Sequence, residues 1–229
     1  MSSVPPLESP PKAICFDLDG TLLDSLVDLA DSMNAALREF GHPEYPTRAY
    51  RYFVGNGARA LVTRTLPEVH RDPETIEVVF QCYQAIYRAN WNNKTRPYPG
   101  IPELLDALQA RDLPLTVLSN KPHASTIVCV EEILKDWEFD VVLGQRDSVP
   151  HKPDPAGVFE IAEKLQLVPS DFLYLGDSVI DMQTATVAGC VIVGVLWGFR
   201  EGDELRQHGA QYLIETPLDL LKLLPSVRV

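Results

Sequence analysis

The amino-acid sequence predicts an α/β protein in which helices cover both faces of a parallel sheet and a smaller all-helical unit is inserted near the start. From about residue 97 onward, short and almost continuously apolar segments alternate with helical patterns. Such alternation is typical of parallel sheets that are buried on both faces. Residues 25–96 show helical periodicity and no convincing strand.

The predicted strands are short apolar runs that end in polar residues or glycine. In chain order they are Ala13–Phe16, Leu115–Asn120, Phe139–Gly144, Phe172–Asp177, Val191–Leu196 and a weaker Gln211–Ile214. Helices are predicted where apolar residues recur three and four positions apart. Those between the strands are Ile101–Ala110, Pro155–Leu165 and Ile180–Ala188, and those of the inserted region are Leu26–Leu37, Ala58–Leu66 and Pro73–Ala89.

These elements predict a division of the chain into three parts. Residues 12–23 and 97–229 form the α/β core, and residues 24–96 form the helical insertion. Residues 1–11 carry four prolines and no apolar stretch, so we expect a disordered tail.

Composition excludes several classes of protein. The formal net charge of −12 argues against nucleic acid as a partner, since phosphate backbones are bound by clustered Lys and Arg. No run of about 18 apolar residues predicts a membrane span. The four cysteines are scattered without metal-ligand spacing, which favours reduced thiols in a cytoplasmic protein. The sequence leaves open whether the protein is a monomer or a homodimer.

Two aspartates follow the first predicted strand. Asp17 and Asp19 stand two positions apart, so their side chains point the same way. Two carboxylates so close repel each other unless a divalent cation or a shared proton compensates them. Gly20 allows a sharp backbone turn beside them.

Further polar residues lie at the same edge of the predicted sheet, where ligands bind in open parallel sheets. They are Ser119, Asn120 and Lys121 after the second strand, Lys152 before a helix, and Asp177, Ser178 and Asp181 after the fourth strand. Together they supply ligands for a hard cation, a carboxylate nucleophile, a hydroxyl, an amide and a fixed positive charge. Phosphoryl transfer requires these groups.

Four motifs in this order resemble those of the haloacid dehalogenase superfamily. They are the DxDGT at Asp17, the Ser-Asn pair at Ser119, the Lys-Pro-x-Pro at Lys152 and the GDSxxD at Gly176. The resemblance spans the chain from Lys12 and implies a Rossmann-like core. The insertion is similar to the small α-helical cap of the subfamily that includes phosphoglycolate phosphatase and β-phosphoglucomutase.

The resemblance implies catalytic and metal-binding roles. Asp17 would be the nucleophile that forms an aspartyl-phosphate, and Asp19 the acid and base. Mg²⁺ would be held by the Asp17 carboxylate, the Asp19 backbone carbonyl and Asp177. The oxygens of the phosphoryl group would be bound by Ser119, the Asn120 backbone N–H and Lys152. Supporting residues would be Asp181, which orients water or Lys152, and the capping hydroxyls of Thr21 and Ser178.

Asp19 also indicates the reaction class. In the dehalogenase branch of the superfamily this position is not Asp, because a halide leaves without a proton. The resemblance therefore implies an oxygen leaving group and hydrolysis of a phosphate ester. The phosphonate-hydrolysing branch uses a cap lysine, and no Lys occurs between Ser25 and Asn92.

A glycine-rich segment of the insertion is the candidate for substrate recognition. Gly55, Asn56 and Gly57 precede a predicted helix whose first-turn N–H groups could bind an anion, and Arg59 could add charge. A simple turn between two helices is the alternative. The segment resembles the GNGA sequence of phosphoglycolate phosphatases, which favours a small phosphorylated metabolite such as 2-phosphoglycolate as substrate.

Other functions fit the same motifs. Within the superfamily, the alternatives are a phosphatase for sugar phosphates, nucleotides or pyrophosphate, and a phosphomutase. Outside enzymes, the alternatives are an inactive relative and a receiver-like domain that is phosphorylated on Asp. Receivers are about half this length and lack an insertion after the first strand.

Overall fold

The computed structural model describes residue 7 and residues 9–225 of the chain. Most of the predicted disordered tail therefore lies outside the described residues. Leu7 is described, and its backbone N–H donates a hydrogen bond to the Leu223 carbonyl at 3.2 Å.

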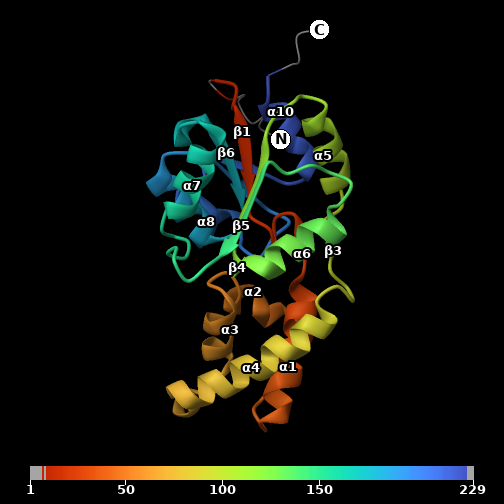
Figure 1. Ribbon diagram of the computed structural model, residues 1–229, viewed down its shortest axis with the longest axis vertical. Coiled ribbons are helices and arrows are strands. Elements are labelled where there is room, and N and C mark those ends of the chain that lie inside the picture. Colours follow the sequence, from red (N-terminus) through yellow and green to blue (C-terminus); the bar gives the residue numbers. More distant parts are fainter. Residues whose placement is uncertain (1–6, 8, 226–229) are drawn as a thin grey trace.

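Six parallel strands form one sheet with the order β5-β4-β1-β6-β7-β8 (Figure 1). The strands are β1 Ala13–Phe16, β4 Leu115–Pro122, β5 Val141–Gln145, β6 Phe172–Gly176, β7 Val191–Val195 and β8 Tyr212–Ile214. Strand β1 lies between β4 and β6, and its Phe16 is in register with Val117 and Leu175. This sheet and its parallel strands confirm the predicted fold class.

Helices cover both faces of the sheet. One apolar cluster joins strand residues such as Ile14 and Phe16 to α5, α6 and α10, and a second joins Ala13 and Cys15 to α7, α8 and α9. The alternation of β1 side chains between the two clusters explains why this strand is apolar at every position. The helices are α5 Ile101–Gln109, α6 His123–Ile133, α7 Ala156–Leu165, α8 Val179–Ala188, α9 Gly202–Gln207 and α10 Leu220–Leu223.

The inserted region forms a helical lobe at one end of the sheet, and Figure 1 shows it beyond the ends of β4 and β5. It contains α1 Leu26–Glu39, α2 Tyr50–Phe53, α3 Ala58–Thr65 and α4 Pro73–Asn90. These helices share an apolar cluster of their own, to which Phe199 is the one contribution from the described residues of the core. We call this lobe the cap.

The cap is joined to the core by a short antiparallel ribbon of β2, Leu23–Asp24, and β3, Arg96–Pro97. The sequence did not predict these strands, because two residues are too few to show an alternating pattern. Where the chain leaves the cap, the Asp28 carboxylate accepts hydrogen bonds at 2.8 Å from the backbone N–H groups of Lys94 and Thr95.

Helix α6 was also missed. Its sequence includes Thr126, Ile127, Val128 and Val130, and β-branched residues lower helix propensity. Packing against β5 and the first apolar cluster overrides that preference. The remaining short elements are the 3₁₀ turns Thr47–Ala49, Glu68–His70, Pro169–Asp171 and Pro217–Asp219. Within the described residues, every helix is too short or too polar to cross a membrane.

Candidate active site

The predicted site residues gather at the carboxyl ends of β1, β4 and β6, where the strand order reverses beside β1. Parallel α/β sheets bind ligands at such a reversal. A cavity of about 410 Å³ lies there between the core and the cap. Its core wall includes Asp17, Asp19, Ser119, Asn120 and Lys121. Its cap wall comes from the loop before α3 and from one side of α4.

Asp17 and Lys152 form a buried ion pair at the end of β1. Lys152 Nζ lies 2.9 Å from Asp17 Oδ1, and 4% of the lysine side chain is exposed. Burial raises the pKa of Asp17 to about 7, helped by the Asp181 carboxylate and opposed by Lys152. Burial disfavours the charge on Lys152, but Asp17 and Asp181 outweigh it and hold the pKa of Lys152 above its ordinary value.

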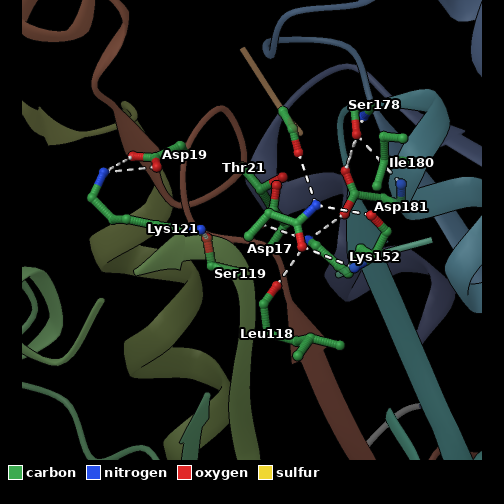
Figure 2. Close-up of polar contacts among 12 residues, drawn as sticks. Asp17, Asp19, Thr21, Leu118, Ser119, Lys121, Lys152, Ser178, Ile180 and Asp181 are labelled. Carbon is green, nitrogen blue, oxygen red and sulfur yellow. Dashed lines mark hydrogen bonds and ion pairs between the residues drawn. The ribbon is translucent and has the colours of Figure 1, made fainter. Parts of the chain in front are cut away.

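Asp181 fixes the position of Lys152. Its Oδ1 lies 2.7 Å from Lys152 Nζ, while its Oδ2 accepts hydrogen bonds from the Ser178 hydroxyl at 2.5 Å and the Ser178 backbone N–H at 3.2 Å. Figure 2 shows Lys152 between the two carboxylates of Asp17 and Asp181. The Ser178 contacts are the capping box at the start of α8, so one motif both begins the helix and orients the lysine.

Asp177 is also buried at the site, and it forms no ion pair with the described residues. Its Oδ2 accepts a hydrogen bond from the Phe199 backbone N–H at 2.6 Å, and its Oδ1 lies 3.5 Å from the Thr21 hydroxyl. A Cβ on Gly20 would lie 2.3 Å from this carboxylate, so only glycine allows the approach. Burial, then Asp181 and Asp17, raise the pKa of Asp177 well above its ordinary value.

The donor set fits a hard divalent cation. Oxygens of Asp17, Asp177 and Asp181 lie within 4.8 Å of one another, and all three residues are buried. Burial is the main cause of the raised pKa values of Asp17 and Asp177, and a bound divalent cation would favour their ionised forms. No described residue donates a hydrogen bond to the Asp19 backbone carbonyl, which therefore has a free acceptor, as its predicted role as a ligand requires.

The Asp19 carboxylate lies apart from this cluster. Its two oxygens lie 3.0 and 2.8 Å from Lys121 Nζ (Figure 2). Oδ1 also accepts a hydrogen bond of 2.6 Å from Ser25. Lys121 in addition donates to the Tyr87 hydroxyl of the cap at 2.8 Å. Burial lowers the pKa of Lys121, but the opposing effects of Asp19 and Tyr87 are larger. The pKa of Lys121 therefore lies well above its ordinary value.

Ser119 and Asn120 lie where the sequence predicts, at the end of β4. Ser119 lines the cavity, and its hydroxyl accepts a hydrogen bond from the Lys121 backbone N–H at 3.2 Å. The Asn120 side chain donates to the carbonyls of Lys152 and Gly55, each at 3.0 Å, and accepts from the Lys152 backbone N–H at 2.9 Å. Asn120 therefore joins the lysine loop to the cap.

The glycine-rich segment of the cap is only partly at the cavity. Gly55 and Gly57 line it. The Asn56 side chain instead accepts a hydrogen bond of 2.6 Å from Arg64. Arg59 pairs with Glu77 at 2.7 Å and is not among the cavity-lining residues.

Sequence reasoning missed three residues that contact the predicted site. Lys121 was noted but given no role, although it follows Ser119 and Asn120 directly. Tyr87 lies on the α4 side that faces the cavity, with Tyr83 and Trp91 at four-residue spacing. That spacing was the available signal. Phe199 contacts Asp177 through its backbone, and no sequence pattern reports such a contact.

Comparison with known proteins agrees with this geometry. A family model described as haloacid dehalogenase-like hydrolase matches residues 14–195. The phosphoglycolate phosphatase of Nitrosospira multiformis is 34% identical over 220 residues, covering 94% of this chain and 96% of that protein. The phosphoglycolate phosphatase of Haemophilus influenzae strain Rd is 33% identical over 221 residues, with coverage of 93% and 98%.

A solved structure is similar over the whole described fold. The crystal structure of a predicted phosphoglycolate phosphatase from Haemophilus somnus has a TM-score of 0.87 and 31% sequence identity. The match covers 94% of this chain and 99% of that chain, so it includes both the core and the cap.

Proposed function

This chain belongs to the haloacid dehalogenase-like hydrolase family and is a phosphatase, and we propose that it hydrolyses 2-phosphoglycolate with Mg²⁺. The observation that carries the proposal is that Asp17, paired with Lys152, and Asp19, paired with Lys121, line the same cavity. One carboxylate can attack phosphorus there while the other exchanges a proton. The names of the relatives support the choice of substrate.

In the proposed reaction, Asp17 attacks the phosphorus atom and the bond from phosphorus to the ester oxygen breaks. Asp19 gives a proton to the departing oxygen, which leaves as the hydroxyl of glycolate. Asp19, now a carboxylate, takes a proton from a water that attacks the aspartyl-phosphate. Inorganic phosphate then leaves and Asp17 is regenerated.

The transferring group needs compensation for its negative oxygens. We propose that the Ser119 hydroxyl, the Asn120 backbone N–H and Lys152 bind them. Support comes from the burial of all three residues, each at most 5% exposed. Ser119 and Asn120 lie near the end of β4, beside Asp17, and Lys152 lies in the loop between β5 and α7. Asp181 and Ser178 act through Lys152, whose ammonium group they hold in place.

Mg²⁺ is proposed to bind Asp17, Asp177 and the Asp19 carbonyl, with Asp181 beside them. When bound, the ion would neutralise charge on the phosphoryl oxygens. Thr21 supports Asp177 from the turn that follows β1.

The cap is proposed to select the substrate. The glycine loop of the cap, Gly55 to Gly57, contacts the core, since the Gly55 carbonyl accepts a hydrogen bond from the Asn120 side chain. With the cap so placed the cavity suits a small molecule, because about 410 Å³ lies at the low end of ligand pockets. The proposal does not include Asn56 and Arg59 as substrate contacts, because their side chains bind Arg64 and Glu77 within the cap.

The domain boundaries and the location of the protein are also proposed. We propose that residues 24–96 act as the cap domain on a core of residues 12–23 and 97–229, supported by the separate apolar cluster of the cap. We also propose a cytoplasmic location, supported by four free cysteines.

The test is phosphate release with and without Mg²⁺ from four substrates: 2-phosphoglycolate, glucose 6-phosphate, AMP and pyrophosphate. We expect kcat/KM to be highest for phosphoglycolate by roughly tenfold or more, and activity to fall by roughly 10³-fold or more in Asp17→Asn. Asp24→Asn, at an exposed position outside the cavity, is the control. A preference for phosphoglycolate of twofold or less would remove the substrate assignment.

A further inference from the structure

Lys121 is a buried cation to which the proposed reaction assigns no step of its own. Only 4% of its side chain is exposed, and it lies in the cavity wall. A buried ammonium group is costly unless its N–H donors are matched. Lys152 already supplies the positive charge beside Asp17. Lys121 is thus a second buried cation in the cavity wall, and its anionic partner in the structure is Asp19.

The contacts of Lys121 join Asp19 to the cap across the cavity wall. Its Nζ donates to both oxygens of Asp19, at 3.0 and 2.8 Å, and to the Tyr87 hydroxyl at 2.8 Å. The Tyr87 oxygen accepts this bond, and no described residue accepts the proton of Tyr87. Lys121 from the core and Tyr87 from the cap thus place two donors side by side in the cavity wall.

The role of Asp19 limits how far the ester oxygen of the substrate can lie from Lys121. To protonate the leaving group it must come within about 2.6–3.2 Å of the ester oxygen. Lys121 is in direct contact with the same carboxylate. In phosphoglycolate a single methylene separates the ester oxygen from the substrate's carboxylate. A substrate whose ester oxygen meets Asp19 can therefore bring its carboxylate to Lys121 and Tyr87.

We infer that Lys121 and Tyr87 bind the carboxylate of the substrate and make the enzyme selective for phosphate esters that carry one. The inference rests on the proposed function and assigns its specificity to two residues. Without Lys121, a carboxylate buried in this part of the cavity would have no buried cation beside it. With Lys121, the Tyr87 proton and the ammonium group supply two hydrogen bonds to the carboxylate.

Two other cations are weaker candidates. Arg88 also lines the cavity but is exposed, so solvent screens its charge. Arg59 is paired with Glu77 away from the cavity. A third possibility is that Lys121 acts only on Asp19, as a positioning residue. That role would affect every alkyl phosphate equally, whereas a carboxylate contact affects only substrates with a carboxylate.

The experiment compares phosphoglycolate with 2-hydroxyethyl phosphate, which has an alkyl leaving group of similar size and a hydroxyl in place of the carboxylate. The variants are Lys121→Met, Lys121→Arg and Tyr87→Phe, each checked for folding by thermal unfolding. Lys94→Met, which removes an exposed cap lysine paired with Asp31, is the control.

We expect the ratio of kcat/KM for phosphoglycolate to that for 2-hydroxyethyl phosphate to fall roughly 30-fold in Lys121→Met, mostly through KM. In Tyr87→Phe the ratio falls about fivefold. Lys121→Arg restores part of it, and Lys94→Met leaves it unchanged.

An unchanged ratio in both Lys121→Met and Tyr87→Phe overturns the inference. An equal loss on both substrates also overturns it and assigns Lys121 to the positioning of Asp19, while the proposed function stands. If the wild-type enzyme itself shows no preference for the carboxylate substrate, the proposed substrate and the inference both fail.

Discussion

The backbone N–H of Phe199 donates a hydrogen bond to Asp177 Oδ2 at 2.6 Å, while the Phe199 side chain is buried in the apolar cluster of the cap. One residue therefore ties a carboxylate of the candidate metal site to the packing of a separate lobe. Arg51 of the cap strengthens the link by donating to the carbonyls of Gly198 and Phe199 at 2.8 and 2.9 Å. Cap position and Asp177 geometry are thus coupled.

This coupling predicts the effect of Phe199→Leu. The smaller side chain leaves the cap cluster underpacked and should destabilise the protein by about 1 to 2 kcal/mol. Because the Asp177 contact shifts with it, we expect the Mg²⁺ concentration for half-maximal activity to rise by about fivefold or more. The control is Met33→Leu, which changes a fully buried residue of the same cluster that does not line the cavity. If both variants keep the wild-type Mg²⁺ dependence, the coupling is wrong.

The second prediction compares Asn120 with Asn34, a control residue that makes the same number of side-chain hydrogen bonds. Its side chain makes three hydrogen bonds, to Gly55 and to both backbone groups of Lys152. Asn34, within the cap, also makes three, to Tyr45 and Tyr50. Each Asn→Ala change should cost about 2 to 3 kcal/mol in urea unfolding. Only Asn120→Ala should lower kcat/KM, by about 100-fold, and equal kinetic losses in the two variants would contradict this.

The sequence predicts the sheet, and the edge at which these polar residues gather, because both depend on local patterns. A run such as Ala13–Phe16 is buried on both faces, so it is apolar at every position, and its end is marked by Asp17. Asp177 and Asp181 follow another buried strand in the same way. Parallel strands bring those ends together, so the position of each motif on its strand is enough to predict a shared site.

Contacts between segments distant in sequence could not be predicted. The pairing of Lys121 with Tyr87 depends on how the cap lies on the core, and the bond from Phe199 to Asp177 uses a backbone group that any residue would supply. Arg59 shows the converse. A cation close in sequence to the glycine loop faces Glu77, because the start of α3 packs against α4.

Metal binding should stabilise the fold measurably. Asp17, Asp177 and Asp181 are buried together, and a divalent cation that binds only the folded state relieves their repulsion. At 100 times its Kd, Mg²⁺ should add about 2.7 kcal/mol, or a rise of roughly 5–10 °C in Tm relative to EDTA-treated protein. Asp177→Asn should show little of this rise. A wild-type Tm that does not respond to Mg²⁺ would exclude the predicted site.

The raised pKa of Asp17 predicts how the stability of the metal-free protein depends on pH. Its value of about 7 in the folded protein exceeds the ordinary value of 3.8, so the folded state binds this proton more tightly than the unfolded state. Between those two values stability must therefore fall as pH rises. From pH 5 to pH 7.5, EDTA-treated wild type should lose about 2 to 3 kcal/mol relative to Asp17→Asn in urea unfolding. Saturating Mg²⁺ should reduce the loss, because the cation favours the ionised carboxylate. Parallel pH profiles for the two EDTA-treated proteins would show that Lys152 already balances Asp17 without a metal.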